Sequence, residues 1–330
     1  MRTRSFLPRL VTVCKIFALG MLLFVASSFV IGSGSLPVRQ DVSKSLGYKK
    51  TEPYGKLFLI TVIDSNDDTI GIRCEKDREE ITYIFEDIAD WLGMEMAEPK
   101  VISGDEFSKA AVNDAIDSWL SDQHPSPDDV VVFYYSGHGF RYPDDKSEYP
   151  RMWLKTSEDR NTETASLSME EDIFNRIVTM GAGVNLVLSD CCNTSVAGDN
   201  ALFDQAKVQT RKRTTRKRAR SADQDRDEGL DNAEKLLRPK QPLSIIATAA
   251  GKGEFAGGKP ETGGFFTNYL IEALSDCIFE NKLAADWESI FQYADKNAGY
   301  WAKSGACPQA KHNAQGRCLQ NAQYKVLKGE

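Results

Sequence analysis

The chain has 330 residues, 41% of them hydrophobic and 27% charged, and its formal net charge is −7. These proportions are ordinary for a globular protein and allow one large core. A nucleic-acid-binding domain usually carries a basic surface, so the acidic balance argues against that class and no nucleic-acid partner is expected.

The first 36 residues have the pattern of a targeting segment. Basic residues from Arg2 to Lys15 precede residues 16–36, which are uncharged and rich in Leu, Phe and Val. This apolar run is longer than most cleaved signal peptides need and is close to a membrane span. The alternative is a buried helix of the domain, but such a helix would show a polar face. We therefore expect residues 1–36 to be a signal peptide or a membrane anchor, the protein to be exported (periplasmic or secreted) or anchored to the membrane, and membrane contact to be made by this segment only.

Residues 37–54, with Pro37 and Pro53, are predicted to be a linker. Beyond it, apolar and β-branched runs predict strands, and apolar residues at helical spacing predict helices. The predicted strands are 56–63, 100–103, 129–135, 183–188, 242–249 and 322–327. The predicted helices are 73–92, 105–120, 168–179, 264–279 and 287–302, and 140–166 is predicted to be mostly loop. Because strands alternate with helices, the fold class is α/β, with a mainly parallel sheet and right-handed crossovers.

One segment departs from this alternation. Residues 207–220 contain eight Lys or Arg residues and no acid, and acidic residues follow from Asp223 onwards. Because like charges repel one another and the segment has little to bury, residues 207–240 are predicted to be an exposed, flexible loop. The densest basic residues are Arg211, Lys212, Arg213, Arg216, Lys217 and Arg218.

Six cysteines lie outside the N-terminal segment, too few for a disulfide-stapled scaffold in a chain of this length. Cys307 and Cys318 flank His312, a spacing that leaves open two reduced thiols, a disulfide or a zinc site. No Cys-x-x-Cys pair is present, so no structural metal site is predicted.

Two candidate catalytic residues lie just past the carboxyl ends of predicted strands, where open parallel sheets bind their ligands. His138 follows the third predicted strand and Cys192 follows the fourth. If these strands are neighbours, the imidazole and the thiol share one sheet edge and can act as base and nucleophile. His124 and His312 are alternative bases by residue type alone, and His124 precedes its strand, at the wrong end of the sheet.

The residues around this pair fit the same chemistry. Asn193, Thr194 and Ser195 favour a helix N-terminus at Cys192, which would lower the pKa of the thiol. The backbone N–H groups of Gly139 and Cys192 could together form an oxyanion hole. Taken singly, a Gly-His-Gly sequence is often only a turn, and adjacent cysteines are often only buried apolar residues.

Several segments resemble motifs of the caspase and metacaspase clan. Residues 132–139 (VFYYSGHG) resemble its histidine motif, and residues 190–194 (DCCNT) resemble its nucleophile motif. Residues 244–250 and 263–270 are similar to its small-subunit region, and residues 74–77 to the segment after its first strand. The order of the motifs and their separation fit as well, because the histidine of caspase-type enzymes lies about 50 residues before the nucleophile.

The resemblance covers residues 55–328 and implies a caspase-like fold: a three-layer sandwich in which an about six-stranded, mostly parallel sheet is flanked by helices. It divides the domain into a large-subunit part, 55–206, and a small-subunit part, 241–328, with the loop 207–240 between them. The implied activity is that of a cysteine endopeptidase that acts on protein or peptide substrates. The alternative is a catalytically inactive caspase-like scaffold or binding protein.

The resemblance also places the nucleophile two residues after Asp190, which favours Cys192 over Cys191. Alternation along an extended backbone then points Cys191 away, as a small buried neighbour. A redox pair formed by the two cysteines is an alternative without a supporting motif, since neighbouring cysteines form only strained bridges.

The resemblance further implies that Asp77 and Asp190 line the first specificity pocket. Two partly desolvated carboxylates favour Arg or Lys and reject an acidic side chain, although each aspartate could instead be a helix cap. An enzyme with this preference would cut its own basic loop, so self-cleavage within 207–220 is predicted, with a monomer or a self-processed two-chain form as the product. A solvated charge run, or a loop that binds anionic lipid or nucleic acid, is the alternative.

Two features differ from the metacaspase pattern. Residues 193–195 stand where metacaspases usually have His-Ser-Gly, and only Glu170, Glu171 and Asp172 occupy the region of an Asp-rich stretch that supports calcium binding. Hydrolysis by a thiol and an imidazole requires no cofactor, and calcium is left open as an activator.

Overall fold

The computed structural model describes residues 55–195, 223–304 and 319–329. The chain divides into two compact units, Met1–Lys49 and Lys50–Glu330, and the first lies wholly outside the described residues. The predictions for the N-terminal segment, for the basic stretch 207–220, and for Cys307, His312 and Cys318 also fall outside them. None of the helices in the described ranges combines the length and the hydropathy needed to cross a bilayer.

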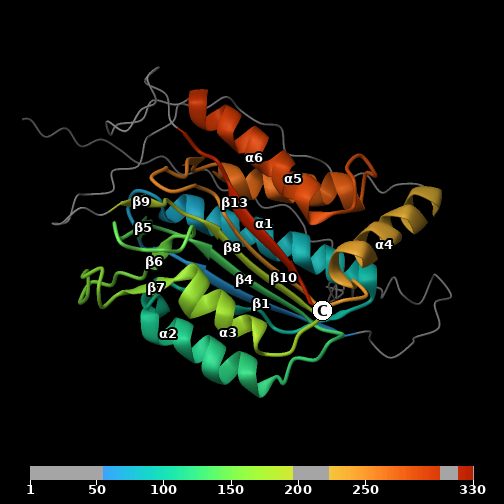
Figure 1. The fold of residues 1–330 in the computed structure, drawn as a ribbon, viewed down its shortest axis with the longest axis horizontal. Helices are drawn as coiled ribbons and strands as arrows, with labels where there is room; N and C mark the ends of the chain where they lie inside the picture. The colour runs from blue at the N-terminus through green and yellow to red at the C-terminus, as the bar shows by residue number, and fades with distance from the viewer. Residues whose placement is uncertain (1–54, 196–222, 305–318, 330) are drawn as a thin grey trace, which may run out of the picture. The chain divides into compact units, whose positions relative to one another are not determined.

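A seven-stranded sheet forms the centre of the described domain (Figure 1). Its path runs β13-β10-β8-β4-β1-β2, and β3 also pairs with β1. All neighbours are parallel except β13, which is antiparallel to β10, so the mostly parallel sheet predicted from the sequence is confirmed. The strands are β1 (Lys56–Ile63), β2 (Glu95–Met96), β3 (Lys100–Ser103), β4 (Val130–Ser136), β8 (Val184–Asp190), β10 (Leu243–Thr248) and β13 (Gln323–Lys328).

Helices cover both faces of this sheet, which gives three layers (Figure 1). One face packs against α1 (Gly71–Leu92), α4 (Asp223–Leu237), α5 (Phe265–Ile278) and α6 (Trp287–Ser304). The other packs against α2 (Lys109–Asp114), η3 (Ala115–Leu120), η4 (Met169–Phe174) and α3 (Asn175–Val178). Alternate side chains of β4 pack on opposite faces of the sheet. Tyr134 packs into the core on the α1 side, and Phe133 and Tyr135 pack into the core on the α2 side. Every residue of β4 is buried, which explains its continuous apolar sequence.

Two helix boundaries differ from the prediction because serines cap the helices. Ser108 Oγ accepts a hydrogen bond from Ala111 N at 3.2 Å, so the predicted helix 105–120 is a short turn, η2 (Gly104–Glu106), followed by a new helix that begins at Lys109. Ser168 Oγ likewise accepts from Glu171 N at 3.1 Å, and the following helical segment begins at Met169.

The prediction of a loop through residues 207–240 is wrong for its second half, since Asp223–Leu237 is the helix α4. The reason is a short apolar pattern at helical spacing, with Ala233, Leu236 and Leu237 buried, on a helix that contacts α1 and α5. Trp287 also donates its indole N–H to the carbonyl of Leu236 at 3.0 Å. The surrounding charge hid this pattern in the sequence.

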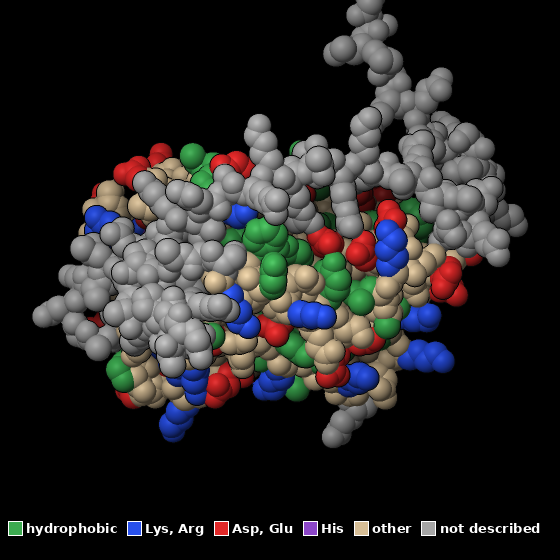
Figure 2. Space-filling view, turned by 90° about the horizontal axis from the view of Figure 1, so that it is seen from above, with side chains coloured by type: hydrophobic (Ala, Val, Ile, Leu, Met, Phe, Trp, Pro, Cys, Tyr) green, Lys and Arg blue, Asp and Glu red, His purple; other side chains and the backbone are tan. Residues whose placement is uncertain are grey.

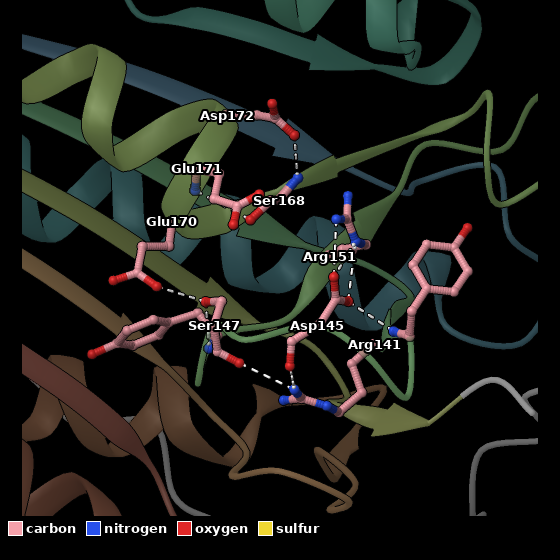
Figure 3. Close-up of polar contacts among 10 residues, drawn as sticks. Arg141, Asp145, Ser147, Arg151, Ser168, Glu170, Glu171 and Asp172 are labelled. Atoms are coloured by element: carbon pink, nitrogen blue, oxygen red, sulfur yellow. Dashed lines mark hydrogen bonds and ion pairs between the residues drawn. The ribbon is translucent and has the colours of Figure 1, made fainter.

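Most of residues 140–166 lie outside regular strands, as predicted, but short strands interrupt the segment. Four short strands form a second sheet here in the order β7-β6-β5-β9, namely β5 (Gly139–Arg141), β6 (Arg151–Trp153), β7 (Ser166–Ser168) and β9 (Thr194–Ser195). Asp145 holds the connection between β5 and β6, because its carboxylate accepts from the Arg151 guanidinium and from Tyr142 N (Figure 3). Strands of two or three residues are too short to show a period in the sequence.

Charges are mixed on the face shown in Figure 2. Lys and Arg side chains are interspersed with Asp and Glu side chains over the described residues of this face. Among the described residues of this face, neither sign of charge forms a continuous patch.

Replacing Phe133 by alanine is expected to lower the free energy of unfolding by about 3–5 kcal/mol, because the ring is fully buried in a central strand and its loss leaves a cavity. Urea unfolding followed by circular dichroism measures the change. Tyr83→Ala on α1 is the control, because that side chain is 52% exposed and its loss should change stability by about 0.5 kcal/mol or less. Equal effects of the two substitutions would contradict the placement of Phe133 in the core.

Candidate active site

The sheet register brings His138 and Cys192 to the same place at the carboxyl edge. In the parallel pair β4–β8, Ser136 lies opposite Asp190, and in β5–β9, Phe140 pairs with Thr194. His138 and Cys192 are each midway between these two paired positions, so their segments run side by side. The expectation that the two strands are neighbours is therefore confirmed.

The two adjacent cysteines pack on opposite faces of the sheet. Cys192 belongs to the core on the α1 side, and Cys191 belongs to the core on the α2 side. A β-carbon at Gly139 would lie 2.6 Å from Cys191 Sγ and would clash with the carbonyl oxygen of Cys192, so only glycine allows the two segments to approach this closely. No disulfide joins Cys191 to Cys192, and their opposite directions argue against a redox pair.

The thiol of Cys192 lies in an enclosed environment. Its side chain is 1% exposed, and Ala256 N donates a hydrogen bond to Sγ at 3.4 Å. Burial raises the pKa of the Cys192 thiol to about 11, and this exceeds the opposing effects of Ala256 and of Arg73. At neutral pH the resting group is therefore a thiol and not a thiolate.

The expected helix N-terminus at Cys192 is wrong. The next two residues after Asn193 form β9, and the Asn193 side chain donates to the carbonyls of Glu148 and Ala250 at 2.9 and 3.2 Å. Asn193 therefore ties together two loops beside the site rather than capping a helix. Within residues 191–195 no helix begins, and burial raises the pKa of the Cys192 thiol.

His138 is held by a hydrogen bond to a carboxylate that the sequence did not reveal. Its Nε2 lies 3.1 Å from Asp67 Oδ2, and the ammonium of Lys155 pairs with the same oxygen. The other oxygen, Asp67 Oδ1, accepts from the backbone N–H groups of Thr69 and Ile70. This network fixes one nitrogen of the imidazole toward Asp67.

The electrostatics of this network leave His138 neutral and Asp67 ionised at pH 7. Burial would raise the pKa of Asp67, but hydrogen bonds from His138 and Lys155 hold it well below its usual range. Burial lowers the pKa of His138, and the Lys155 charge adds to this effect while Asp67 opposes it. A neutral imidazole can accept a proton, as a general base must.

The side chains that lie close enough to share a metal ion are not Glu170, Glu171 and Asp172, which the sequence analysis considered for calcium. In the parts of the chain that the structure describes, the donors close enough to share an ion are Asp64, Asp67 and His138, and Lys155 already supplies a positive charge to them. Glu170, Glu171 and Asp172 lie in the first turn of η4. There, Glu170 accepts from Ser147 Oγ at 2.7 Å and Asp172 from Ser168 N at 2.7 Å (Figure 3).

Asp77 and Asp190 are brought together under the ends of the central strands, and each is 1% exposed. Asp77 accepts from Gly264 N and Ser136 Oγ, both at 2.7 Å, and lies inside α1, so it does not cap that helix. Asp190 Oδ2 accepts from the N–H and the hydroxyl of Thr267 at 3.0 Å and so satisfies the first turn of α5. Burial raises the pKa of both carboxyls, and the charge of Asp190 raises that of Asp77 further.

A buried arginine that was not among the site residues predicted from the sequence lies near Asp77 and Asp190. Arg73 is on α1, about one turn before Asp77, and its charge acts on Asp77, Asp190 and Cys192. Its position in the first turn of a strongly charged helix gave no sign that the side chain would point inward.

Comparison with protein families identifies the domain. The family model described as the caspase domain matches residues 70–312. The chain belongs to this family. The solved structure of caspase-1 from Spodoptera frugiperda is similar with a TM-score of 0.42 and 11% sequence identity, over 84% of this chain and 88% of that one. No protein of curated function matches the chain.

Membership of the caspase domain family supports a cysteine peptidase-like function. Together with the observed sheet order, it confirms the caspase-like α/β sandwich expected from the sequence.

Proposed function

We propose that this caspase domain is a cysteine endopeptidase with Cys192 as nucleophile and His138 as general base, and with Asp67 as a positioning residue for the imidazole. The observation that carries the proposal is the register that sets His138 and Cys192 side by side at the carboxyl edge of β4 and β8. The hydrogen bond between His138 and Asp67 supports it, because a base must be oriented to act on one particular thiol.

In the proposed reaction, His138 takes the proton from Cys192 as Sγ attacks the carbonyl carbon of the substrate. The negative oxygen that forms is stabilised by the N–H groups of Gly139 and Cys192. His138 then gives its proton to the leaving amine, and an acyl-enzyme remains. Water, deprotonated by His138, hydrolyses this thioester and restores the thiol. Asp67 stabilises the imidazolium while it exists.

For the substrate, we propose peptides with Arg or Lys before the scissile bond. Asp77 and Asp190 are the supporting residues. Burial raises the pKa of both carboxyls, so a cationic side chain that reaches them favours their ionised forms, whereas an acidic side chain gains no such partner. Neither the thiol chemistry nor this recognition requires a cofactor, and calcium is tested as an activator.

A panel of fluorogenic peptides that end in Arg, Lys or Asp tests the proposal, with the mature chain and with or without calcium. Turnover of the Arg and Lys peptides and none of the Asp peptide is the expected result, with a preference of at least about 10²-fold. Turnover of the Asp peptide alone would overturn the specificity. A calcium effect that survives replacement of Glu170 and Asp172 would show that those two residues are not its cause.

A catalytically inactive scaffold is the second candidate, and one observation favours it. The Cys192 thiol is enclosed, and its pKa of about 11 leaves little thiolate at neutral pH. If no peptide is cleaved and Cys192 resists alkylation in the folded protein, the scaffold becomes the better account.

Self-cleavage within residues 207–220 is expected to convert the wild-type chain into two fragments on a denaturing gel, because this stretch is dense in the residues that the proposed pocket selects. Cys192→Ala should stay intact, and Cys191→Ala should be cleaved like the wild type. An eight-fold Gln variant at Lys207, Arg211, Lys212, Arg213, Arg216, Lys217, Arg218 and Arg220 should also stay intact. Equal banding of wild type and Cys192→Ala would contradict the prediction.

A further inference from the structure

Arg73 is a buried charged side chain whose guanidinium is incompletely hydrogen-bonded. It is 6% exposed, and among the residues that the structure describes, Nε and Nη2 have no hydrogen-bond partner. Oδ1 of the neighbouring Asp190 is buried without a partner there as well. Burying such groups without hydrogen bonds costs several kcal/mol, so a purely structural arginine is a poor explanation for this arrangement.

The charges around Arg73 explain why it stays in place. Burial opposes the charge of Arg73, but Cys74, Asp190 and Asp77 together raise its pKa. The guanidinium therefore remains positive, and its charge acts on the carboxyl groups of Asp77 and Asp190, although its Nε and Nη2 donate a hydrogen bond to neither. A substrate's Arg or Lys side chain would bring the same charge to the same pair.

The hairpin of β11 (Gly258–Lys259) and β12 (Gly263–Gly264) encloses this group of charges. A β-carbon at Gly258 would clash with Cδ of Arg73. Gly264 comes as close to the carboxylate of Asp190, and Gly263, at φ +84°, comes as close to that of Asp77. The hairpin backbone thus lies directly on the arginine stem and on both carboxylates, and a second long side chain has no room beside them.

We propose that Arg73 occupies the primary specificity pocket as the chain's own substitute for a basic substrate side chain. Hydrolysis of an Arg or Lys peptide then requires Arg73 to leave the acidic pair. The inference rests on the specificity proposed above and deepens it, because it makes Arg73 a competitor for that site rather than a ligand of the substrate.

Arg73→Ala tests this inference through two readouts, one of which is independent of catalysis. Benzamidine, a small cation that mimics an arginine side chain, should raise the melting temperature of Arg73→Ala and slow alkylation of its Cys192 by iodoacetamide, with little effect on the wild type. The ratio of kcat/KM for an Arg peptide to that for a Leu peptide should rise by about tenfold or more in Arg73→Ala. Arg73→Lys should behave like the wild type, because it keeps the charge in the pocket.

Arg78→Ala is the matched control, since Arg78 lies on the same helix in a partly exposed pair with Glu75 and should change neither readout. If Arg73→Ala does not unfold cooperatively, the same two readouts are measured on Arg73→Gln, which keeps most of the side-chain volume.

Equal benzamidine responses in wild type and variant would overturn the inference. Cleavage after Asp by the wild type that is lost in Arg73→Ala would also overturn it, because Arg73 would then bind an acidic side chain. If no form cleaves any peptide, the proposed function fails, while the benzamidine response still decides whether Arg73 fills a cation site.

Discussion

Replacing Cys192 by alanine is expected to lower kcat/KM for an Arg peptide by at least about 10³-fold, whereas Cys191→Ala is expected to retain activity. The two residues are adjacent and equally buried, so general damage to the fold would affect both variants. They differ in direction, because Cys192 packs on the α1 side of the sheet with the acidic pair, and Cys191 packs behind Gly139 on the α2 side. The comparison therefore isolates the reacting sulfur.

Steady-state kinetics on the Arg peptide measures the difference, and thermal unfolding checks that each variant is folded. Mass spectrometry after reaction with a peptide chloromethyl ketone that ends in Arg provides a second readout, and the adduct should be on Cys192. If Cys191→Ala lost activity while Cys192→Ala remained active, Cys191 would be the nucleophile and the assignment of Cys192 would be wrong. A comparable residual rate in both would indicate that neither sulfur reacts.

The central strands were predictable because burial on both faces leaves a direct trace in the sequence. In β1 and β4 almost every residue is apolar, and the predicted range of β1 agrees with the observed strand Lys56–Ile63. The short strands β5 to β7 left no such trace, since their order depends on pairing with each other and on the contacts of Asp145. The helix α4 was missed for a different reason: its few buried residues are diluted by charge.

The candidate site was predictable where a residue directly ends a buried strand. His138, Asp190 and Cys192 fulfil that condition, and the register of β4 and β8 brings them together. Asp67 and Lys155 do not, because they lie 88 positions apart and meet only through the second sheet. One signal was available for Asp67, since it lies in the acidic turn after β1, whose carboxyl end meets the same edge.

The enclosed state of the thiol was not predictable, because it depends on contacts from distant loops. Ala256 bonds to Cys192, and the glycine hairpin lies on Arg73 and the two aspartates. These contacts come from the segment between β10 and α5, beyond the basic stretch at which self-cleavage is expected.

Asp67→Asn and Lys155→Met are expected to move the acid limb of the pH–activity profile in opposite directions. Activity requires neutral His138, so it is lost as the pH falls through the pKa of the imidazole. Asp67 stabilises the imidazolium and raises this pKa, so Asp67→Asn should shift the limb to lower pH. Lys155 repels the imidazolium and lowers the pKa, so Lys155→Met should shift the limb to higher pH.

The separate effects of Asp67→Asn on kcat and on KM distinguish a positioning role for Asp67 from a purely structural one. Asp67→Asn should lower kcat by about 10²-fold or more with little change in KM, because the imidazolium that forms during attack loses its partner. Lys155→Arg keeps the charge and should leave the acid limb in place. Profiles of kcat/KM against pH for the four proteins provide the measurement. Shifts in the same direction for Asp67→Asn and Lys155→Met would mean that the variants act through the fold and not through the charge next to His138.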